Sequence, residues 1–313
     1  MNHFFDVDDI GSLELALARA QSIKAQPKKG YTERNRKSIG LLFFNPSLRT
    51  RLSSQRAAQN LGMDVVVLDV GSESWKLEFS DGKIMNGASA EHIKEAAGVM
   101  GAYFDFLAIR AFASLQDRDL DYAEPVLTSF MKHAGVPIIN MESSTGHPLQ
   151  AFADLITIDE FKKNERPKVV LSWAPHPRAL PHAVANSFAQ WMNRAPVDLI
   201  ITHPEGYELD PKFVGSARVE TNQFLAFEGA DFIYAKNWSS YNHYGQVLHQ
   251  DFAWMINQGK MDLTNQAYFM HCLPVRRNMI VSDQIIDSPK SLVIQQAANR
   301  VVSMQTVLSM LLE

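Results

Sequence analysis

The chain has 313 residues, of which 46% are hydrophobic and 20% charged, and its formal net charge is −4 at pH 7. Since one domain typically holds roughly 150 residues, this length predicts about two domains, each able to bury its own core. The proportions exclude disordered, collagen-like and coiled-coil proteins, and the small net charge argues against nucleic acid or a membrane surface as the main partner.

The N-terminus carries acidic residues where a signal peptide needs a basic start, and no apolar run reaches the roughly 18 residues that span a bilayer. We therefore expect a cytoplasmic protein. The single cysteine, Cys272, cannot form an internal disulfide or supply a cysteine metal cluster, which fits a reducing compartment.

Short apolar runs alternate with helical stretches twice along the chain, and a long amphipathic helix that starts near His147 separates the two series. Nearly continuous apolar strands are typical of parallel sheets covered on both faces. We predict an α/β fold of two doubly wound parallel-sheet domains, residues 1–150 and 151–296, with a helix over residues 297–313 that packs back on one of them. The predicted strands are 38–44, 64–69, 105–110 and 137–141, then 168–173, 197–202, 231–238 and 268–273.

Ligands of such sheets bind beyond the carboxyl ends of the strands, so the residues that follow each run are candidates. After the first run, Pro46 fits the first turn of a helix, and residues 47–50 would then offer N–H groups, hydroxyls and a guanidinium to a phosphate. No glycine fingerprint of a dinucleotide site or a P-loop follows this strand. The alternative is that Ser47 only caps the helix and the arginines are solvated.

Four motifs follow predicted strands: Ser47-Leu48-Arg49-Thr50-Arg51, Arg110, His147-Pro148-x-Gln150 and His271-Cys272-Leu273-Pro274. Together they resemble the carbamoyl-phosphate motifs of the aspartate and ornithine transcarbamylases. The resemblance extends from about residue 40 to 300, and four motifs in the same order are far more specific than one. It implies a carbamoyl-phosphate domain, an amine-substrate domain, a homotrimer with active sites between subunits, and no metal or cofactor.

The resemblance also implies roles for individual residues. Fixed cationic donors suit a phosphate dianion, and donors already aimed at a carbonyl suit its conversion to an oxyanion. Alternatives remain for two of these residues: His147 as an ordinary helix-start histidine and Cys272 as a small buried hydrophobe. The implied carbamoyl-phosphate residues are Ser47, Leu48, Arg49, Thr50, Trp75, Arg110, His147, Gln150, Cys272, Leu273 and Arg300, of which Arg49, Thr50, Arg110, His147 and Cys272 are the expected catalytic residues.

The amine-binding half departs from the ornithine enzymes, which carry an Asp-x-x-x-Ser-Met-Gly pattern for the free α-amino group. This chain has Lys236 near the expected acid and lacks Ser-Met-Gly. A lysine repels an α-ammonium and favours a carboxylate, which predicts a substrate with a blocked amino group, unless Lys236 is only a solvated surface lysine. The pattern Lys236-x-Trp238, with Trp75, Glu142 and His176-Pro177, resembles the N-acylornithine transcarbamylases.

In that branch, the residue matching Trp75 reaches a neighbouring subunit's site, and the segment 71–90 suits a loop long enough to do so. Trp75 as a loop anchor and Glu142 as a helix cap are the alternatives. The acetyl-specific enzymes have a glutamate at the position of Ala90 and a lysine at that of Ile280. The residues expected to contact the acylated amino acid are Glu142, His176, Arg178, Lys236, Arg276 and Ala90.

A glutamate at position 90 would crowd and repel a second carboxylate, whereas Ala90 does neither. We therefore expect carbamoyl transfer from carbamoyl phosphate to N-succinyl-L-ornithine, giving N-succinyl-L-citrulline and phosphate, in arginine biosynthesis. The alternatives are an N-acetylornithine or plain ornithine transcarbamylase and a catalytically silent carbamoyl-phosphate sensor. An NAD-type dehydrogenase is disfavoured by the missing glycine fingerprint.

Overall fold

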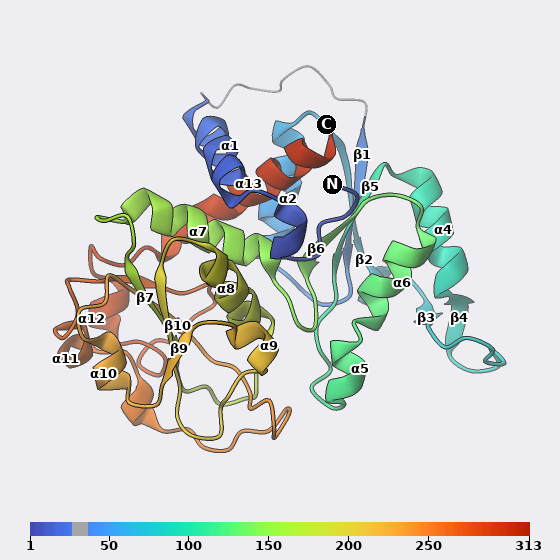
Figure 1. Cartoon of the computed structure of the whole chain (residues 1–313). Helices are drawn as coiled ribbons and strands as arrows, with labels where there is room; N and C mark the ends of the chain where they lie inside the picture. Colours follow the sequence, from blue (N-terminus) through green and yellow to red (C-terminus); the bar gives the residue numbers. More distant parts are fainter. Residues whose placement is uncertain (27–36) are drawn as a thin grey trace. The chain divides into compact units, whose positions relative to one another are not determined.

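The computed structural model describes residues 1–26 and 37–313, which divide into two compact units (Figure 1). Unit 1 consists of Met1–Ser114, Asp119–Leu149 and Arg300–Glu313. Unit 2 consists of Leu115–Arg118 and Gln150–Asn299. None of the helices in the described part of the chain is long and apolar enough to cross a membrane.

Unit 1 is built on a four-stranded parallel sheet in the order β2-β1-β5-β6. Leu107 and Ile109 of β5 belong to the same buried core as Leu127 and Phe130 of helix α6. Burial of these apolar side chains stabilises the packing of the helix on the sheet. The strands are β1 (Ser38–Phe43), β2 (Asp64–Asp69), β5 (Phe106–Arg110) and β6 (Ile138–Glu142), and the longer helices are α1 (Leu13–Ala25), α2 (Arg49–Asn60), α4 (Ile93–Tyr103), α6 (Pro125–His133) and the end of α13 (Val293–Leu311).

The segment 71–90 is not the plain loop that the sequence predicts. It holds most of a short helix, α3 (Val70–Glu73), the strand β3 (Lys76–Glu78) and the start of its parallel partner β4 (Ser89–His92). These strands have only three and four residues, most of them only partly buried, and they lack the apolar periodicity that marks a strand. The remaining elements of unit 1 are η1 (Val7–Ile10) and all but the first residue of α5 (Arg118–Tyr122).

Unit 2 is built on a five-stranded parallel sheet in the order β11-β10-β7-β8-β9. On one face, Phe152 of α7 stacks on Trp191 of α8, and Phe188 packs on Tyr234. The strands are β7 (Lys168–Trp173), β8 (Asp198–Thr202), β9 (Arg218–Glu220), β10 (Phe232–Lys236) and β11 (Tyr268–Met270), and the helices are α7 (Pro148–Phe161), α8 (Ala183–Arg194), α9 (Pro211–Val214), α10 (Gln223–Phe227), η2 (Phe252–Trp254), α11 (Gln258–Met261) and α12 (Asp283–Ile286).

The fold of two parallel-sheet α/β domains is confirmed, with corrections to element bounds. The predicted strands 231–238 and 268–273 end earlier, at Lys236 and Met270, because the chain turns away from the sheet where polar residues follow. The last helix begins at Val293 rather than at residue 297. Strand β9 was missed because its three residues lie largely exposed at the sheet edge.

Each sheet has one topological switch point, where the strand order reverses, and ligands of open parallel sheets bind beyond the strand ends there. In unit 1 the chain passes from β1 to β2 on one side and later places β5 on the other side of β1. In unit 2 the same reversal falls between β7 and β10. The residues at and after the ends of β1, β5, β7 and β10 are therefore candidates for ligand binding.

Candidate active site

The loop after β1 in unit 1 leads into helix α2. The sequence-based expectation that Pro46 begins this helix is wrong: α2 begins at Arg49, and residues 44–48 form the turn from strand to helix. The N-cap is Leu48, which makes no side-chain capping bond, so Ser47 does not cap the helix. The first N–H groups of α2 therefore lack a side-chain cap, as in many helix termini that bind anions.

Five side chains around this helix start form the cationic cluster of unit 1: Arg49, Arg110, Glu142, His147 and Arg300. Arg110 Nε lies 3.3 Å from Glu142 Oε2, and His147 Nε2 lies 3.4 Å from the same oxygen. Arg300 Nη2 lies 3.5 Å from His147 Nε2 and donates a 2.5 Å hydrogen bond to Thr50 Oγ1. These contacts join residues far apart in the sequence, at the ends of β5 and β6, in the turn after β6, at the start of α2 and on α13.

The cluster has more positive than negative charge. Burial lowers the pKa of Arg110, Glu142 opposes this shift, and the neighbouring Arg49 guanidinium adds to it. The Nε atoms of Arg49 and Arg110 are buried and make no hydrogen bond to the residues that the structure describes. Three guanidinium groups against one carboxylate leave two positive charges, which match a phosphate dianion.

The loop before His147 is held by a residue that sequence reasoning missed. Glu124 accepts hydrogen bonds from Ser143 Oγ at 2.7 Å, from the Thr145 N–H at 2.7 Å and from Thr145 Oγ1 at 2.6 Å. Burial raises the pKa of Glu124, and these hydrogen bonds oppose that shift. Glu124 also has a left-handed backbone, with φ of 51°. Its carboxylate thus fixes the turn from which His147 projects.

At the switch point of unit 2, His176 lies among three cations. Its Nε2 accepts a hydrogen bond from Arg276 Nε at 3.1 Å, and its Nδ1 lies 3.1 Å from the Arg178 backbone nitrogen and 2.8 Å from the Arg178 carbonyl oxygen. Burial lowers the pKa of His176, and the charges of Lys236, Arg276 and Arg178 lower it further. A neutral imidazole among three cations defines a second site that favours an anion.

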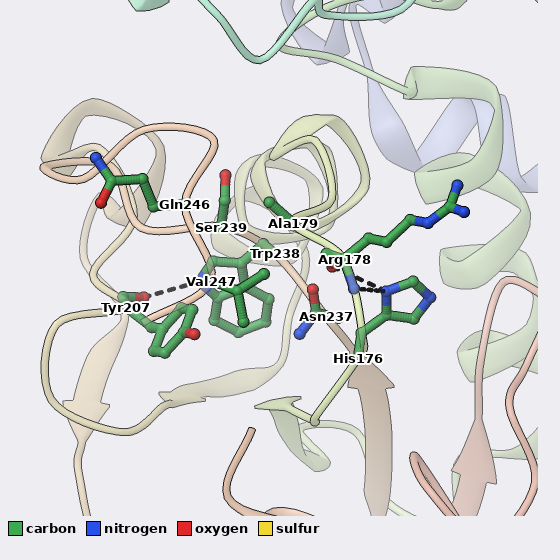
Figure 2. A pocket seen from close by; sticks show the side chains of 9 residues that line it. All are labelled: His176, Arg178, Ala179, Tyr207, Asn237, Trp238, Ser239, Gln246 and Val247. Atoms are coloured by element: carbon green, nitrogen blue, oxygen red, sulfur yellow. Dashed lines mark hydrogen bonds between the residues drawn. The ribbon is translucent and has the colours of Figure 1, made fainter. Parts of the chain in front are cut away.

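A small pocket is lined by His176 and by other residues from the loops that follow β7, β8 and β10 (Figure 2). Trp238 forms a rigid wall: it is fully buried, and its Nε1 donates to the Tyr207 carbonyl at 2.8 Å. The Asn237 amide donates to the Ala174 carbonyl at 2.7 Å and so ties the two loops together. Figure 2 shows the Arg178 side chain extending away from the Trp238–Tyr207 pair.

His182 lies within hydrogen-bond distance of Ser239, the residue after Trp238, and it makes the free energy of unfolding depend on pH. Its Nε2 donates to the Ser239 carbonyl at 2.7 Å, and burial lowers the pKa of His182 to about 4. As the pH falls from 6.5 toward 4, the unfolded chain binds a proton that the folded chain refuses, so the free energy of unfolding falls. We expect His182 to lower the free energy of unfolding by about 3 kcal/mol between pH 7 and pH 4.

Urea denaturation of the wild type and of His182→Gln at pH 7 and at pH 4 checks this expectation. The glutamine amide can donate to the same carbonyl but does not titrate, so the variant should lose about 3 kcal/mol less over this range. Equal losses in both proteins would show that another group causes the pH dependence.

The predicted motif at residues 271–274 lies in unit 2, where Cys272 is buried and forms no disulfide. Leu273 has a left-handed backbone, with φ of 56°, and its N–H donates to His271 Nδ1 at 2.8 Å. This hydrogen bond fixes the turn that carries Cys272, and we expect the thiol to orient the substrate without a covalent role. We expect Cys272→Ser to keep activity within about tenfold, since one small hydrogen-bonding group replaces another. Steady-state rates test this, and complete loss with intact carbamoyl-phosphate binding would contradict it.

The remaining predicted residues lie elsewhere in the two units. Trp75 is 59% exposed next to β3, and its Nε1 donates to Glu91 Oε2 at 2.8 Å. Ala90 is exposed on β4, on the same two-stranded ribbon. Ile280 is only 2% exposed and belongs to the hydrophobic core of unit 2. Glu142 ends β6 and pairs with cations, so it is not a helix cap.

Comparison with known proteins defines the class. Residues 2–160 match the family model "Aspartate/ornithine carbamoyltransferase, carbamoyl-P binding domain" and residues 181–311 match "Aspartate/ornithine carbamoyltransferase, Asp/Orn binding domain". The chain therefore belongs to the aspartate/ornithine carbamoyltransferase family, as its motifs indicate, and it is a carbamoyltransferase.

The chain is also similar over its full length to individual members of the family. The chain is 57% identical to the N-succinylornithine carbamoyltransferase of Bacteroides fragilis over 316 aligned residues, covering 100% of the chain and 99% of the relative. It is 36% identical to the N-acetylornithine carbamoyltransferase of Xanthomonas axonopodis pv. citri, covering 99% and 96%. A solved acetylornithine transcarbamylase complexed with acetylcitrulline superposes with a TM-score of 0.93 at 36% identity, covering 99% of both chains.

Proposed function

We propose that this carbamoyltransferase transfers the carbamoyl group of carbamoyl phosphate to the side-chain amine of N-succinyl-L-ornithine, giving N-succinyl-L-citrulline and phosphate in arginine biosynthesis. The observation that carries this proposal is the group of cations, Lys236, Arg276 and Arg178, around neutral His176 at the switch point of unit 2. Cations favour a substrate whose α-amino group is blocked and whose carboxylates are charged. The 57% identical relative bears the name of this activity.

Carbamoyl phosphate is assigned to the cationic cluster of unit 1. The N–H groups at the start of α2, the Ser47 and Thr50 hydroxyls and the Arg49 guanidinium bind the phosphate. Arg110 and His147 donate to the carbamoyl oxygen and stabilise it as the carbonyl becomes an oxyanion. Glu142 Oε2 lies 3.3 Å from Arg110 Nε and 3.4 Å from His147 Nε2, and its negative charge holds both side chains near it before substrate binds.

The amine must lose a proton before it can attack. For a side-chain amine with a pKa near 10.4, removing this proton at pH 7 costs roughly 4.6 kcal/mol of free energy. The neutral nitrogen then attacks the carbamoyl carbon, the C–O bond to phosphate breaks, and the departing phosphate takes the proton. Holding both reactants in attack geometry lowers the barrier without a covalent enzyme intermediate.

The choice of a succinyl rather than an acetyl group is assigned to position 90. Ala90 is a small, uncharged and exposed side chain on β4, and it leaves room for a second carboxylate. A solved variant of N-acetyl-L-ornithine transcarbamylase with one glutamate replaced by alanine is complexed with carbamyl phosphate and N-succinyl-L-norvaline. It is 37% identical to this chain, covers 99% of it and 100% of its own length, and superposes with a TM-score of 0.92.

The proposal includes a homotrimer in which Trp75 reaches the site of a neighbouring subunit. Trp75 is exposed, and its indole is oriented by Glu91 from the paired strand, which supports a role away from its own unit. The residues assigned to the acylated amino acid are Glu142, His176, Arg178, Lys236, Arg276 and Ala90, and those assigned to carbamoyl phosphate also include Leu48, Gln150, Cys272, Leu273 and Arg300.

Initial rates measured separately with N-succinylornithine, N-acetylornithine and ornithine test the function. We expect N-succinylornithine to give the highest kcat/KM and a product with the mass of N-succinylcitrulline. Lys236→Met should lower that value with little effect on KM for carbamoyl phosphate. Tight phosphate-ligand binding without any citrulline-type product would favour the carbamoyl-phosphate sensor instead.

A further inference from the structure

Glu124 of unit 1 is a buried carboxylate that lies outside the residues assigned to either substrate. It is the N-cap of helix α6, is only 6% exposed, and has a left-handed backbone with φ of 51°. Glycine adopts this conformation far more easily than glutamate, and other residues that are held in it cluster at functional sites. A strained and buried glutamate at this position indicates that its side chain has a specific role.

The backbone of Glu124 is fixed from both sides. Its N–H donates to the Asp121 carbonyl at 3.1 Å, and its own carbonyl accepts from the Thr128 N–H at 3.0 Å and from Thr128 Oγ1 at 2.7 Å. The next residue, Pro125, has its φ angle set by its ring. The carboxylate therefore projects from a rigid corner between α5 and α6.

Four donors from the turn 143–146 converge on the Glu124 carboxylate. Oε1 accepts from Ser143 Oγ at 2.7 Å and from the N–H and the hydroxyl of Thr145 at 2.7 and 2.6 Å. Oε2 accepts from the Ser144 N–H at 3.1 Å. An ionised carboxylate only accepts hydrogen bonds, so its charged form matches four donors. One rigid group thus fixes three consecutive residues of the turn.

The turn 143–146 connects two residues of the cationic cluster of unit 1. Glu142 precedes the turn at the end of β6, His147 follows it, and Glu142 Oε2 lies 3.4 Å from His147 Nε2. Within the turn, the Ser143 N–H donates to the Gly146 carbonyl at 2.7 Å. The conformation of the turn therefore determines where the imidazole lies, and a side chain that fixes the turn also fixes His147.

We infer that Glu124 is a positioning residue that holds the turn 143–146 so that the His147 imidazole is aimed at the carbamoyl oxygen as this oxygen becomes an oxyanion. The inference rests on the role proposed for His147 and deepens it. A displacement of an aligned group by about 1 Å can lower a rate about 100-fold. Loss of the Glu124 acceptors should therefore slow carbamoyl transfer without weakening phosphate binding, which is assigned to Arg49 and the start of α2.

The test measures the single-turnover rate of carbamoyl transfer, with enzyme in excess over carbamoyl phosphate, and inhibition by inorganic phosphate as a probe of the anion site. Glu124→Met has nearly the same length but offers no oxygen acceptor, and we expect its rate to fall about 10- to 100-fold. Glu124→Gln keeps an acceptor oxygen and should recover most of this loss. In both variants, the inhibition constant of inorganic phosphate should change by less than about threefold.

Two controls separate positioning from a general loss of stability. Asp121→Asn alters a second buried carboxylate of the same corner, which accepts from the N–H and the hydroxyl of Ser114 in the loop after β5. This variant should change the rate by less than about threefold. In a His147→Asn background, Glu124→Met should cause no further loss, because both substitutions act on the same imidazole.

If Glu124→Met does not fold, two substitutions of Thr145 replace it. Thr145→Val has the same shape but lacks the hydroxyl that donates to Glu124 Oε1, and it should slow transfer about fivefold. Thr145→Ser keeps this hydroxyl and should transfer at nearly the wild-type rate. Equal rates for the two variants would contradict the inference.

An unchanged rate in folded Glu124→Met overturns the inference, and so does a further loss in the His147→Asn background. A parallel loss of phosphate inhibition, or equal slowing by Asp121→Asn, overturns it as well, because either result indicates a merely structural role. If His147→Asn alone transfers at the wild-type rate, the role proposed for His147 is wrong and the inference falls with it. The two failures are therefore distinguishable.

Discussion

Arg110→Met is expected to lower kcat/KM for carbamoyl phosphate by about 10²- to 10³-fold. Arg110 ends β5 at the switch point, its Nε has no hydrogen bond among the described residues, and its guanidinium lies beside Glu142. Removing it deletes a preorganised donor to the developing oxyanion, an effect of this size in other enzymes. It also leaves the Glu142 carboxylate to repel the incoming dianion.

Two further variants separate these effects. Arg110→Met combined with Glu142→Gln removes the repelling carboxylate and should restore phosphate affinity but not kcat. Arg51→Met is the matched control, since Arg51 belongs to the same motif but its side chain is exposed. We expect it to change kcat/KM by less than about threefold. Equal losses at Arg51 and Arg110 would show that only the general positive field matters.

Ala90→Glu is expected to lower the preference for N-succinylornithine over N-acetylornithine on the order of 100-fold. The new carboxylate would face the second carboxylate of the succinyl group, and like charges in close contact cost several kcal/mol. An acetyl group carries no such charge and should be tolerated. Ala90 is exposed on β4, so the substitution should not disturb folding.

Ala90→Gln is the matched control because it has nearly the same size without the charge. If repulsion decides, Gln should reduce the preference much less than Glu. Equal effects of both substitutions would indicate that space, rather than charge, selects the acyl group. If neither substitution changes the preference, a residue other than Ala90 selects the acyl group.

The sequence predicted the parts of the site that follow buried strands. Arg110 and Lys236 end β5 and β10, and His147 and His176 lie in the turns after β6 and β7, which is where the strand-end rule looks for candidate ligand-binding residues. The fold class was predictable for the same reason, since long apolar runs with helices between them allow few other arrangements.

Other parts could not be predicted because they depend on contacts between distant residues. Glu124 binds a turn about 20 residues away, and Asp154 binds Gln296, which is 142 residues away. Nothing local marks either carboxylate, and both are acids on amphipathic segments that would ordinarily face solvent. The start of α2 at Arg49 was missed because Pro46 is equally compatible with a helix and with the turn before it.

One competition experiment tests the central claim most directly. The enzyme receives limiting carbamoyl phosphate with equal concentrations of ornithine, N-acetylornithine and N-succinylornithine, and mass spectrometry quantifies the products. Since the product ratio equals the ratio of kcat/KM values, N-succinylcitrulline should exceed each of the other products by at least about tenfold. A majority of citrulline or N-acetylcitrulline, or phosphate release without a carbamoylated product, would contradict the account.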